Sequence, residues 1–396
     1  MALGTLLNRR KRIYMKKYYN LPINDKMIVF DAFMGRKYVD SPKAIYEYML
    51  RDPKFSDYTF VWAFKSPTEK QYYFNNNRTI VIKYNSATYF EYCAQAKYWI
   101  TNSRIPEYLV KKDEQVFIQC WHGTPLKKLG FDIEVKGGNE NTDNELLRQK
   151  YNNDAMRYDY MISPSKYCSE KFISAFNLKA LEKENIIVEE GYPRNDYLIN
   201  YKESDIEEIK INLNIPRDKK VILYAPTWRD NQHTIGVGYT YELGVDFDNL
   251  RKSLSDEYII LFRAHYFVAN QFDFEKYNGF VYNVSDYEDI NDLYVISDML
   301  ITDYSSVFFD YAVLNRPIYF YMYDLDQYKG ELRGFYLDIY TELPGRIYED
   351  ESKLLIDIKE SVYDYSFLES FNQKFNAWQT GNCAQKVIDI IFSDIK

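Results

Sequence analysis

Short apolar segments alternate with helical patterns along most of this 396-residue chain. This alternation predicts parallel strands joined by crossover helices, and it restricts the fold to the α/β class with helices on both faces of each sheet. A single hydrophobic core rarely grows beyond about 250 to 300 residues, so the length predicts two such domains. We expect a basic arm at residues 1–24, a first domain at 25–200 and a second at 201–396.

The two domains have similar predicted elements. Strands are expected in the first domain at residues 27–30, 58–64, 79–83, 98–102, 116–118, 160–163 and 186–190, and in the second at 221–227, 258–265, 280–282, 299–303 and 317–321. The main helices are expected at residues 41–49, 88–97, 144–156, 166–175, 204–213 and 289–297, after Ser306 as far as residue 314, and at 384–392. A polar segment at 130–143 predicts a mobile loop, and the last helix is expected to pack on the first domain.

Charge is unevenly distributed along the chain. The net charge of −8 argues against a nucleic-acid-binding protein. The first twenty residues, however, contain no acidic residue and six basic ones, namely Arg9, Arg10, Lys11, Arg12, Lys16 and Lys17. Such an arm suits an anionic membrane surface, where each basic residue contributes roughly 1 kcal/mol. The alternative is a solvated, partly disordered terminus.

The cysteines and the hydropathy pattern indicate a reducing compartment. The four cysteines are widely spaced and have no neighbouring histidine at metal-ligand spacing, so we expect free thiols and no metal site. Residues 1–7 are too short and too weakly apolar for a signal peptide, and no uncharged apolar stretch approaches about 18 residues. These features predict a cytoplasmic protein that is at most peripheral to a membrane.

Two of the three histidines follow predicted strands. His122 comes directly after the strand at 116–118, where Gly123 and Pro125 end the extended run, and His265 ends the strand at 258–265. Ligands of open α/β sheets bind at the carboxyl ends of the strands, so we expect these two strand ends to face each other across a cleft between the domains. A histidine satisfied within a loop is the alternative in each case.

Four segments carry polar groups at strand ends or turns. Ser305 and Ser306 precede a predicted helix, where their hydroxyls and free backbone N–H groups suit a phosphate, although ordinary helix capping is the alternative. Asp310 lies one turn later on the same face. Arg263 and His265 would share one face of their strand, which lets a cation and an imidazole converge on one anion. Thr227 ends another strand, and an arginine, Arg194, lies in a proline-containing turn.

Taken together, these segments resemble the CDP-glycerol glycerophosphotransferase family, which comprises teichoic acid glycerol-phosphate and ribitol-phosphate transferases. The resemblance covers about residues 25–340, and each motif is weak alone whereas the ordered set is specific. The motifs are Trp121-His122-Gly123-Thr124-Pro125-Leu126-Lys127, Gly191-Tyr192-Pro193-Arg194-Asn195-Asp196, Ala225-Pro226-Thr227-Trp228-Arg229, Arg263-Ala264-His265, and Ile301-Thr302-Asp303-Tyr304-Ser305-Ser306 with Asp310.

This resemblance implies a GT-B-like fold of two Rossmann-type domains, with the CDP-linked donor held mainly by the second. It implies transfer of glycerol phosphate from CDP-glycerol to a hydroxyl of an undecaprenyl-diphosphate-linked glycan at the cytoplasmic face of the membrane, with release of CMP. His122 and His265 would be the essential histidines. The residues implied in substrate binding are Trp121, Gly123, Thr124, Pro125, Arg194, Pro226, Thr227, Arg263, Ala264, Ser305, Ser306 and Asp310.

We expect direct in-line phosphoryl transfer, with His122 as the base and His265 with Arg263 stabilising the leaving CMP, although the histidines could exchange roles. No cofactor is implied beyond the donor, and assistance by a divalent cation stays open. The chain length favours an enzyme that adds the first or few units. The alternatives are a ribitol-phosphate transferase, a polymerase of the same family, a GT-B sugar-nucleotide glycosyltransferase or epimerase, and an inactive membrane-associated scaffold.

Overall fold

The chain folds into two compact units. The computed structural model describes residues 2–133, 141–227, 233–234, 238–239, 244–264, 272–327 and 334–393, with side chains over these ranges except at 2–8, 141–144, 233–234 and 238–239. Unit 1 comprises Met1–His122, Gly130–Asp196 and Trp378–Lys396, and unit 2 comprises Gly123–Leu129 and Tyr197–Ala377. Two α/β units with parallel sheets confirm the predicted fold class.

Unit 1 is built on a seven-stranded parallel sheet with the strand order β3-β2-β1-β4-β5-β6-β7. Its strands are β1 (Asn24–Asp31), β2 (Thr59–Phe64), β3 (Thr79–Lys83), β4 (Ala96–Thr101), β5 (Val116–Gln119), β6 (Tyr160–Ile162) and β7 (Ile187–Val188). Chain order reverses between β1 and β4, which pair through contacts such as Val29 opposite Trp99. In open sheets of this kind, the carboxyl ends of the two strands at the reversal flank the usual ligand position.

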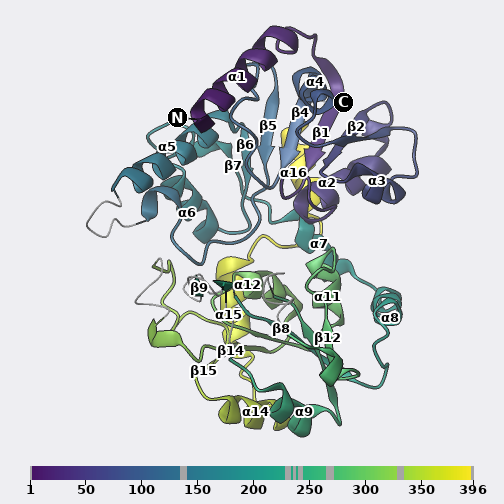
Figure 1. Ribbon diagram of the computed structural model, residues 1–396, viewed down its shortest axis with the longest axis vertical. Coiled ribbons are helices and arrows are strands. Elements are labelled where there is room, and N and C mark those ends of the chain that lie inside the picture. Colours follow the sequence, from purple (N-terminus) through teal and green to yellow (C-terminus); the bar gives the residue numbers. More distant parts are fainter. Residues whose placement is uncertain are drawn as a thin grey trace. The chain divides into compact units, whose positions relative to one another are not determined.

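Helices cover this sheet, as the upper part of Figure 1 shows. They are α1 (Ala2–Lys17), α2 (Asp40–Arg51), α3 (Pro67–Lys70), α4 (Ala87–Gln95), α5 (Asn141–Arg157), α6 (Lys166–Ala175) and, from the far end of the chain, α16 (Cys383–Ile391). Aromatic rings fill much of the core, and Trp62 stacks between Phe30 and Phe64 at centroid distances of 5.3 and 5.5 Å. Burying such rings removes about 150 to 250 Å² each from water, which makes them dominant contributors to stability.

The basic arm is helical. In α1, Tyr14 is fully buried and packs edge-on against Phe90 of α4 at 6.4 Å, while Arg10 lies over the ring of Tyr108 at 5.4 Å. Every other described side chain of the helix, from residue 9 to 17, is exposed. Within residues 9–17, the part of α1 whose side chains are described, Tyr14 is therefore the buried anchor and the basic side chains are exposed.

The α16 helix packs beside α2 in unit 1. The carboxylate of Asp196 accepts hydrogen bonds from the backbone N–H groups of Cys383 and Ala384, both at 2.8 Å, and so satisfies the first turn of the helix. Just after the helix, the ring of Phe392 lies 5.3 Å from Phe55 and 4.4 Å from Tyr98. The segment is thus fixed by both a cap and aromatic packing.

Unit 2 contains a six-stranded parallel sheet with the order β12-β11-β8-β13-β14-β15. Its strands are β8 (Lys220–Ala225), β11 (Tyr258–Phe262), β12 (Val281–Asn283), β13 (Met299–Thr302), β14 (Ile318–Tyr321) and β15 (Ile347–Tyr348), and a separate pair is formed by β9 (His233–Thr234) and β10 (Gly238–Tyr239). The main helices are α8 (Glu203–Asn212), α9 (Phe247–Leu254), α11 (Ile290–Ile296), α12 (Val307–Tyr311), α14 (Glu351–Lys359) and α15 (Ser366–Phe375), and a short α7 (Asp196–Asn200) begins at the unit boundary. Chain order reverses between β8 and β13, as it does between β1 and β4 in unit 1.

Several elements differ from their predictions. The strand predicted at 258–265 ends at Phe262. The N–H of Arg263 still donates to the carbonyl of Tyr224 in β8, but the N–H of Ala264 donates to the side chain of Ser285 in a later loop. The helix predicted as far as residue 314 is α-helical only over Val307–Tyr311 and then tightens into a 3₁₀ turn. The predicted loop at 130–143 begins with a 3₁₀ turn, Gly130–Asp132, and α5 already starts at Asn141, while residues 134–140 lie outside the described ranges. The helices α1, α9, α14 and α15 were not predicted.

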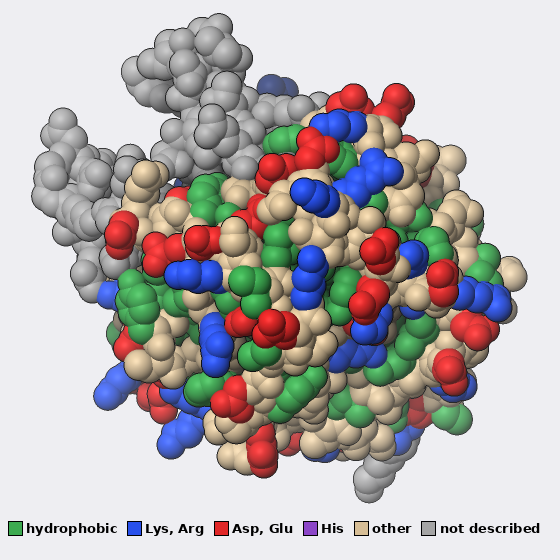
Figure 2. Space-filling model, turned by 90° about the horizontal axis from the view of Figure 1, so that it is seen from below, with side chains coloured by type: hydrophobic (Ala, Val, Ile, Leu, Met, Phe, Trp, Pro, Cys, Tyr) green, Lys and Arg blue, Asp and Glu red, His purple; other side chains and the backbone are tan. Residues whose placement is uncertain are grey.

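Acidic and basic side chains are interspersed on the face drawn in Figure 2. Exposed ion pairs of this kind include Lys220 with Glu257 at 3.3 Å and Arg346 with Asp357 at 3.4 Å. Each such pair contributes about 0 to 1 kcal/mol. This face therefore has the mixed charge that favours solubility, and it does not gather one sign of charge.

Candidate active site

His122 lies just beyond β5, next to the strand reversal of unit 1. Its Nδ1 atom lies 2.8 Å from the backbone carbonyl oxygen of Asn102, the residue after β4. A carbonyl oxygen can only accept, so Nδ1 carries the proton and, in the neutral ring, Nε2 holds a lone pair. His122 is an exposed residue, although the rings of Trp121 and Phe33 lie close to its imidazole. Desolvation by the surrounding protein lowers the pKa of His122, the Asn102 bond and Asp40 oppose this shift, and Arg194 adds to it.

Aromatic rings hold the imidazole on both sides. Trp121 stacks on His122 at a centroid distance of 4.4 Å, and Phe33 lies 6.0 Å away. Trp121 is itself buried against Phe172 and Phe176, and its φ of 51° lies in the left-handed region that a tryptophan rarely adopts. The predicted ligand-binding role of Trp121 is untested, and its observed contacts orient His122.

A polar cluster lies behind His122. The buried side chain of Asn102 donates from Nδ2 to Oδ2 of Asp40 at 2.9 Å and accepts from the backbone N–H of Phe33 at 2.8 Å. Asp40 forms an ion pair with Arg194 at 3.2 Å, and the side chains are only 7% and 5% exposed. The Arg194 guanidinium also lies 4.1 Å above the ring of Tyr192. Arg194, which was predicted to line the donor site, is thus placed in unit 1 and engaged with a carboxylate, and its donor role stays a prediction.

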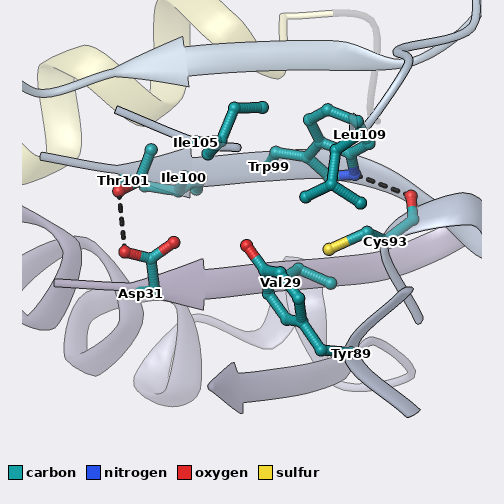
Figure 3. Close-up of a pocket in the computed structure, with 9 residues that line it drawn as sticks. All are labelled: Val29, Asp31, Tyr89, Cys93, Trp99, Ile100, Thr101, Ile105 and Leu109. Carbon is teal, nitrogen blue, oxygen red and sulfur yellow. Dashed lines mark hydrogen bonds between the residues drawn. The ribbon is translucent and has the colours of Figure 1, made fainter. Parts of the chain in front are cut away.

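Asp31, the last residue of β1, is buried at the same strand reversal. It accepts hydrogen bonds from the hydroxyl groups of Thr101 at 3.0 Å and Ser103 at 3.4 Å. Burial raises the pKa of Asp31 to about 7, although the hydrogen bonds oppose this. Figure 3 shows Asp31 at the edge of a cavity of about 10 Å³ that Tyr89 and Cys93 also line. Asp31 therefore fixes the two residues that flank Asn102.

The segment after His122 belongs to unit 2. Its residues pair with a second stretch of that unit, since the N–H of Lys128 donates to the carbonyl of Gly334 at 3.0 Å and the N–H of Tyr336 donates to the carbonyl of Leu126 at 2.8 Å. Thr124 and Pro125 are buried within it. Gly123 lies against Ser306, because a Cβ atom at Gly123 would come within 3.2 Å of the Ser306 hydroxyl oxygen. The glycine therefore gives the backbone close access to the serine pair.

Thr227 and Asp303 join the two strand ends at the reversal of unit 2. Oδ1 of Asp303 accepts from the backbone N–H of Thr227 at 2.8 Å, from the Thr227 hydroxyl, and from the backbone N–H of Tyr304 at 2.7 Å. Pro226, which precedes Thr227, is buried. These hydrogen bonds fix the turn that connects β13 to Ser305 and Ser306.

The serine pair lies at the start of α12. Oγ of Ser305 accepts from the N–H of Val307 at 3.4 Å, and Ser306 occupies the N-cap position, where its side chain makes no capping hydrogen bond. Asp310 lies in the same helix and is partly buried. Because α12 has only five residues, a phosphate here would depend on hydroxyl and N–H groups more than on a helix dipole.

Arg263 lies beyond β11, so strand periodicity no longer supports a shared face with His265, and whether the two side chains converge is untested. Its Nη1 donates to the carbonyls of Val284 and Tyr287, both at 3.0 Å, and burial lowers its pKa. The N–H of Ala264 donates to the hydroxyl of Ser285 at 3.2 Å. His265 lies outside the described residues, as do Trp228 and Arg229 of the Thr227 motif, and their predicted roles are untested.

Sequence reasoning did not select Asp31, Asp40, Asn102 or Asp303 as site residues. A signal existed for three of them, because Asp31, Asn102 and Asp303 each follow or end a predicted apolar strand. Asp40 gave no such signal, since its partners Asn102 and Arg194 are distant in sequence.

No metal or membrane span is indicated within the described ranges. Among those residues, no three His, Cys, Asp or Glu side chains are grouped so that they could hold a metal ion. The four cysteines are buried free thiols. No helix in the same ranges is long and apolar enough to cross a bilayer.

Comparison with known proteins gives one consistent result. The family model described as CDP-glycerol:poly(glycerophosphate) glycerophosphotransferase matches residues 13–393. A teichoic acid poly(glycerol phosphate) polymerase of Staphylococcus epidermidis is 41% identical over 98% of this chain and 53% of its own length. A teichoic acid glycerol-phosphate transferase of Staphylococcus aureus is 43% identical over 93% of each chain.

The fold is also similar to a solved one. A structure of the wall teichoic acid polymerase TagF, 40% identical, matches with a TM-score of 0.88 over all of this chain and 95% of that chain. A TagF variant soaked with CDPG matches as well, with a TM-score of 0.87 over 98% of this chain and 94% of that chain, at 40% identity. This chain spans about half the length of the Staphylococcus epidermidis relative.

Proposed function

Because this chain belongs to the CDP-glycerol:poly(glycerophosphate) glycerophosphotransferase family, we propose that it transfers glycerol phosphate from CDP-glycerol to an acceptor hydroxyl and releases CMP. The observation that carries the proposal is the state of His122. Its Nδ1–H bonds to a carbonyl oxygen and its lowered pKa keeps the ring neutral, so Nε2 is available as a base near pH 7.

In the proposed reaction, Nε2 of His122 takes the proton of the acceptor hydroxyl. The acceptor oxygen then forms a bond to the glycerol-bearing phosphorus as the bond from that phosphorus to the bridging oxygen breaks, and CMP leaves. Ser305, Ser306 and the backbone N–H groups beside them bind the phosphates, and Arg263 and His265 stabilise the leaving group. Positioning and charge stabilisation supply most of the acceleration in such transfers.

The remaining substrate contacts are assigned by the motifs. Asp310 lies near the glycerol or ribose hydroxyls in this proposal, and the other residues line the donor or acceptor: Trp121, Gly123, Thr124, Pro125, Arg194, Pro226, Thr227 and Ala264. The close approach of Gly123 to Ser306 supports the pairing of these motifs, because a bulkier residue at 123 would crowd the serine hydroxyl. A divalent cation stays open as an aid to charge neutralisation.

The proposed acceptor is an undecaprenyl-diphosphate-linked glycan, and the proposed location is the cytoplasmic face of the membrane. The support is α1, in which the basic side chains of residues 9–17 are exposed while Tyr14 is buried against unit 1. Several such residues near anionic lipid give roughly 1 kcal/mol each, enough for peripheral binding.

Glycerol phosphate is favoured over ribitol phosphate. The relatives named for glycerol phosphate that cover nearly all of this chain are 38–43% identical to it, whereas a poly(ribitol-phosphate) polymerase is 33% identical over 69% of it. The number of units added is not distinguished by length, because both a transferase and a polymerase of similar size match over nearly their full lengths. Addition of the first or few units stays our proposal.

The direct test is CMP release from CDP-glycerol, with and without a lipid-linked disaccharide acceptor. Acceptor-dependent release should fall about 10²- to 10⁴-fold in His122→Asn. The same change at His233, which lies in a polar stretch of the sequence, is the matched control. CMP release from CDP-ribitol but not from CDP-glycerol would leave the reaction type unchanged and change the donor. No CMP release by folded protein with either donor would refute the proposal.

A further inference from the structure

We propose that Asn102 and Asp40 are positioning residues that hold His122 in its Nδ1–H tautomer and so present Nε2 to the acceptor. The proposal rests on the transfer reaction proposed above, but its geometry belongs to unit 1 alone. Neither residue lies in the motifs that indicated the function.

Asn102 is clamped at every polar atom of its side chain. Its Oδ1 accepts from the N–H of Phe33 and its Nδ2 donates to Asp40, so only one orientation of the amide satisfies both partners. Its backbone oxygen is the acceptor for Nδ1 of His122. Since Asn102 is fully buried, it cannot exchange these bonds for water, and its carbonyl stays aimed at the imidazole.

Asp40 fixes the side-chain amide of Asn102 and is itself fully hydrogen-bonded. Oδ2 accepts from Asn102, while Oδ1 accepts from Nη1 of Arg194 at 3.2 Å and from the N–H of Ser41 at 2.5 Å. A buried carboxylate needs such a complete set of donors, and removing one partner of a buried charge pair leaves the other charge uncompensated. Arg194 thereby fixes Asp40, and Asp40 fixes Asn102.

The backbone around this cluster is in uncommon conformations. Asp40, Phe33 and Met34 have φ values of 68°, 50° and 56°, which non-glycine residues rarely adopt. Such a conformation is strained and persists only where surrounding contacts impose it. Three such residues lie around Asn102. Their strained backbone indicates that the position of Asn102 matters for more than ordinary core packing.

The chemical consequence concerns which nitrogen is free. If the Asn102 carbonyl moved away, neutral His122 could place its proton on Nε2, and that nitrogen would then donate instead of accepting. A base with the wrong tautomer cannot take the acceptor proton, although the protein would still fold and bind its donor. This separates a positioning role from a purely structural one.

Exchanging the side chains of Asn102 and Asp40 tests whether their hydrogen bond positions His122. In Asn102→Asp, two carboxylates face each other where a hydrogen bond was, so the turn should shift. In the double variant Asn102→Asp with Asp40→Asn, the side-chain oxygen at position 40 still accepts from Arg194 and Ser41, and the side-chain amide there donates to the carboxylate at position 102. The other oxygen of that carboxylate still accepts from Phe33, so the double variant restores every hydrogen bond of the cluster. Asn75→Asp, the same change at an exposed position of unit 1, is the matched control.

Two measurements apply. The ¹⁵N signals of labelled histidine report the tautomer without any substrate, and with only three histidines the His122 signal is assigned by its loss in His122→Asn. CMP release reports kcat. We expect Asn102→Asp to lower the Nδ1–H fraction and to lower kcat about 10- to 100-fold, the double variant to recover both, and Asn75→Asp to change neither.

Other results would overturn the proposal. These are an unchanged tautomer in folded Asn102→Asp, a loss of kcat without a tautomer change, or an equal further loss when Asn102→Asp is added to His122→Asn. If Asn102→Asp does not fold, Asp40→Asn gives the same test, because one amide oxygen cannot serve both Asn102 and Arg194. Absence of CMP release by wild type would refute the proposed function, while the tautomer measurement would still decide this inference.

Discussion

Replacing Asp31 with asparagine should remove a pH dependence from the stability of unit 1. The Asp31 carboxyl is buried, and burial raises its pKa from 3.8 to about 7. The folded state therefore holds this proton more tightly than the unfolded state does. The resulting stabilisation is fully present below pH 3.8 and is lost as the pH rises through about 7.

The size of the effect follows from the two pKa values. One pKa unit corresponds to about 1.4 kcal/mol, so the difference between 3.8 and about 7 amounts to about 4 kcal/mol in total. Between pH 5 and pH 8 the part lost is about 2.5 kcal/mol, because some of the change has already occurred by pH 5. Asparagine has nearly the same shape and does not titrate, so Asp31→Asn should lack this slope.

Urea unfolding followed by tryptophan fluorescence measures the slope. Trp62, Trp99 and Trp121 are buried in unit 1 and report on it. The free energy of unfolding of wild type should fall by about 2.5 kcal/mol more than that of Asp31→Asn between pH 5 and pH 8. Asp113→Asn, the same change at an exposed carboxyl of unit 1, is the control. Equal slopes for wild type and Asp31→Asn would refute the reasoning.

Two further results are expected. Because the pKa of His122 is lowered from 6.5, the acidic limb of the kcat/KM–pH profile should lie below pH 6.5, and a limb above that value would show that His122 is not the base measured. Phe392→Ala should lower the free energy of unfolding of unit 1 by about 3 kcal/mol, since its buried ring contacts two others, whereas Tyr72→Ala at an exposed ring should change it by less than about 0.5 kcal/mol in the same urea titration.

The α/β class and the positions of most strands followed from the sequence, because buried parallel strands are short apolar runs that need no long-range information to recognise. The strand at 79–83 and the helix at 166–175 have the predicted bounds. Where prediction failed, tertiary contacts decided the outcome. The N–H of Ala264 donates to the Ser285 side chain of a later loop, so the strand stops before the predicted residue 265, and the basic arm becomes a helix because Tyr14 finds a buried position.

The site was less predictable than the fold. His122 was selected because its strand ends in an abrupt turn, and the structure gives it a tautomer and a lowered pKa that suit a base. Asp40 was missed because its importance comes from Asn102, 62 residues later in the chain, and from Arg194, 154 residues later. Local patterns identify side chains that end strands, but they do not reveal which distant partners hold them.

The place of α16 has a consequence for how the protein is made. Unit 1 receives this helix only after residues 197–377 of unit 2 have been synthesised, and at about 5 to 20 residues per second those roughly 180 residues take about 10 to 40 s. During that interval the nascent first unit exposes Phe55 and Tyr98, the rings that Phe392 later covers. Unit 1 therefore emerges from the ribosome without its last helix, and this aromatic surface stays uncovered at least until residue 392 has been synthesised.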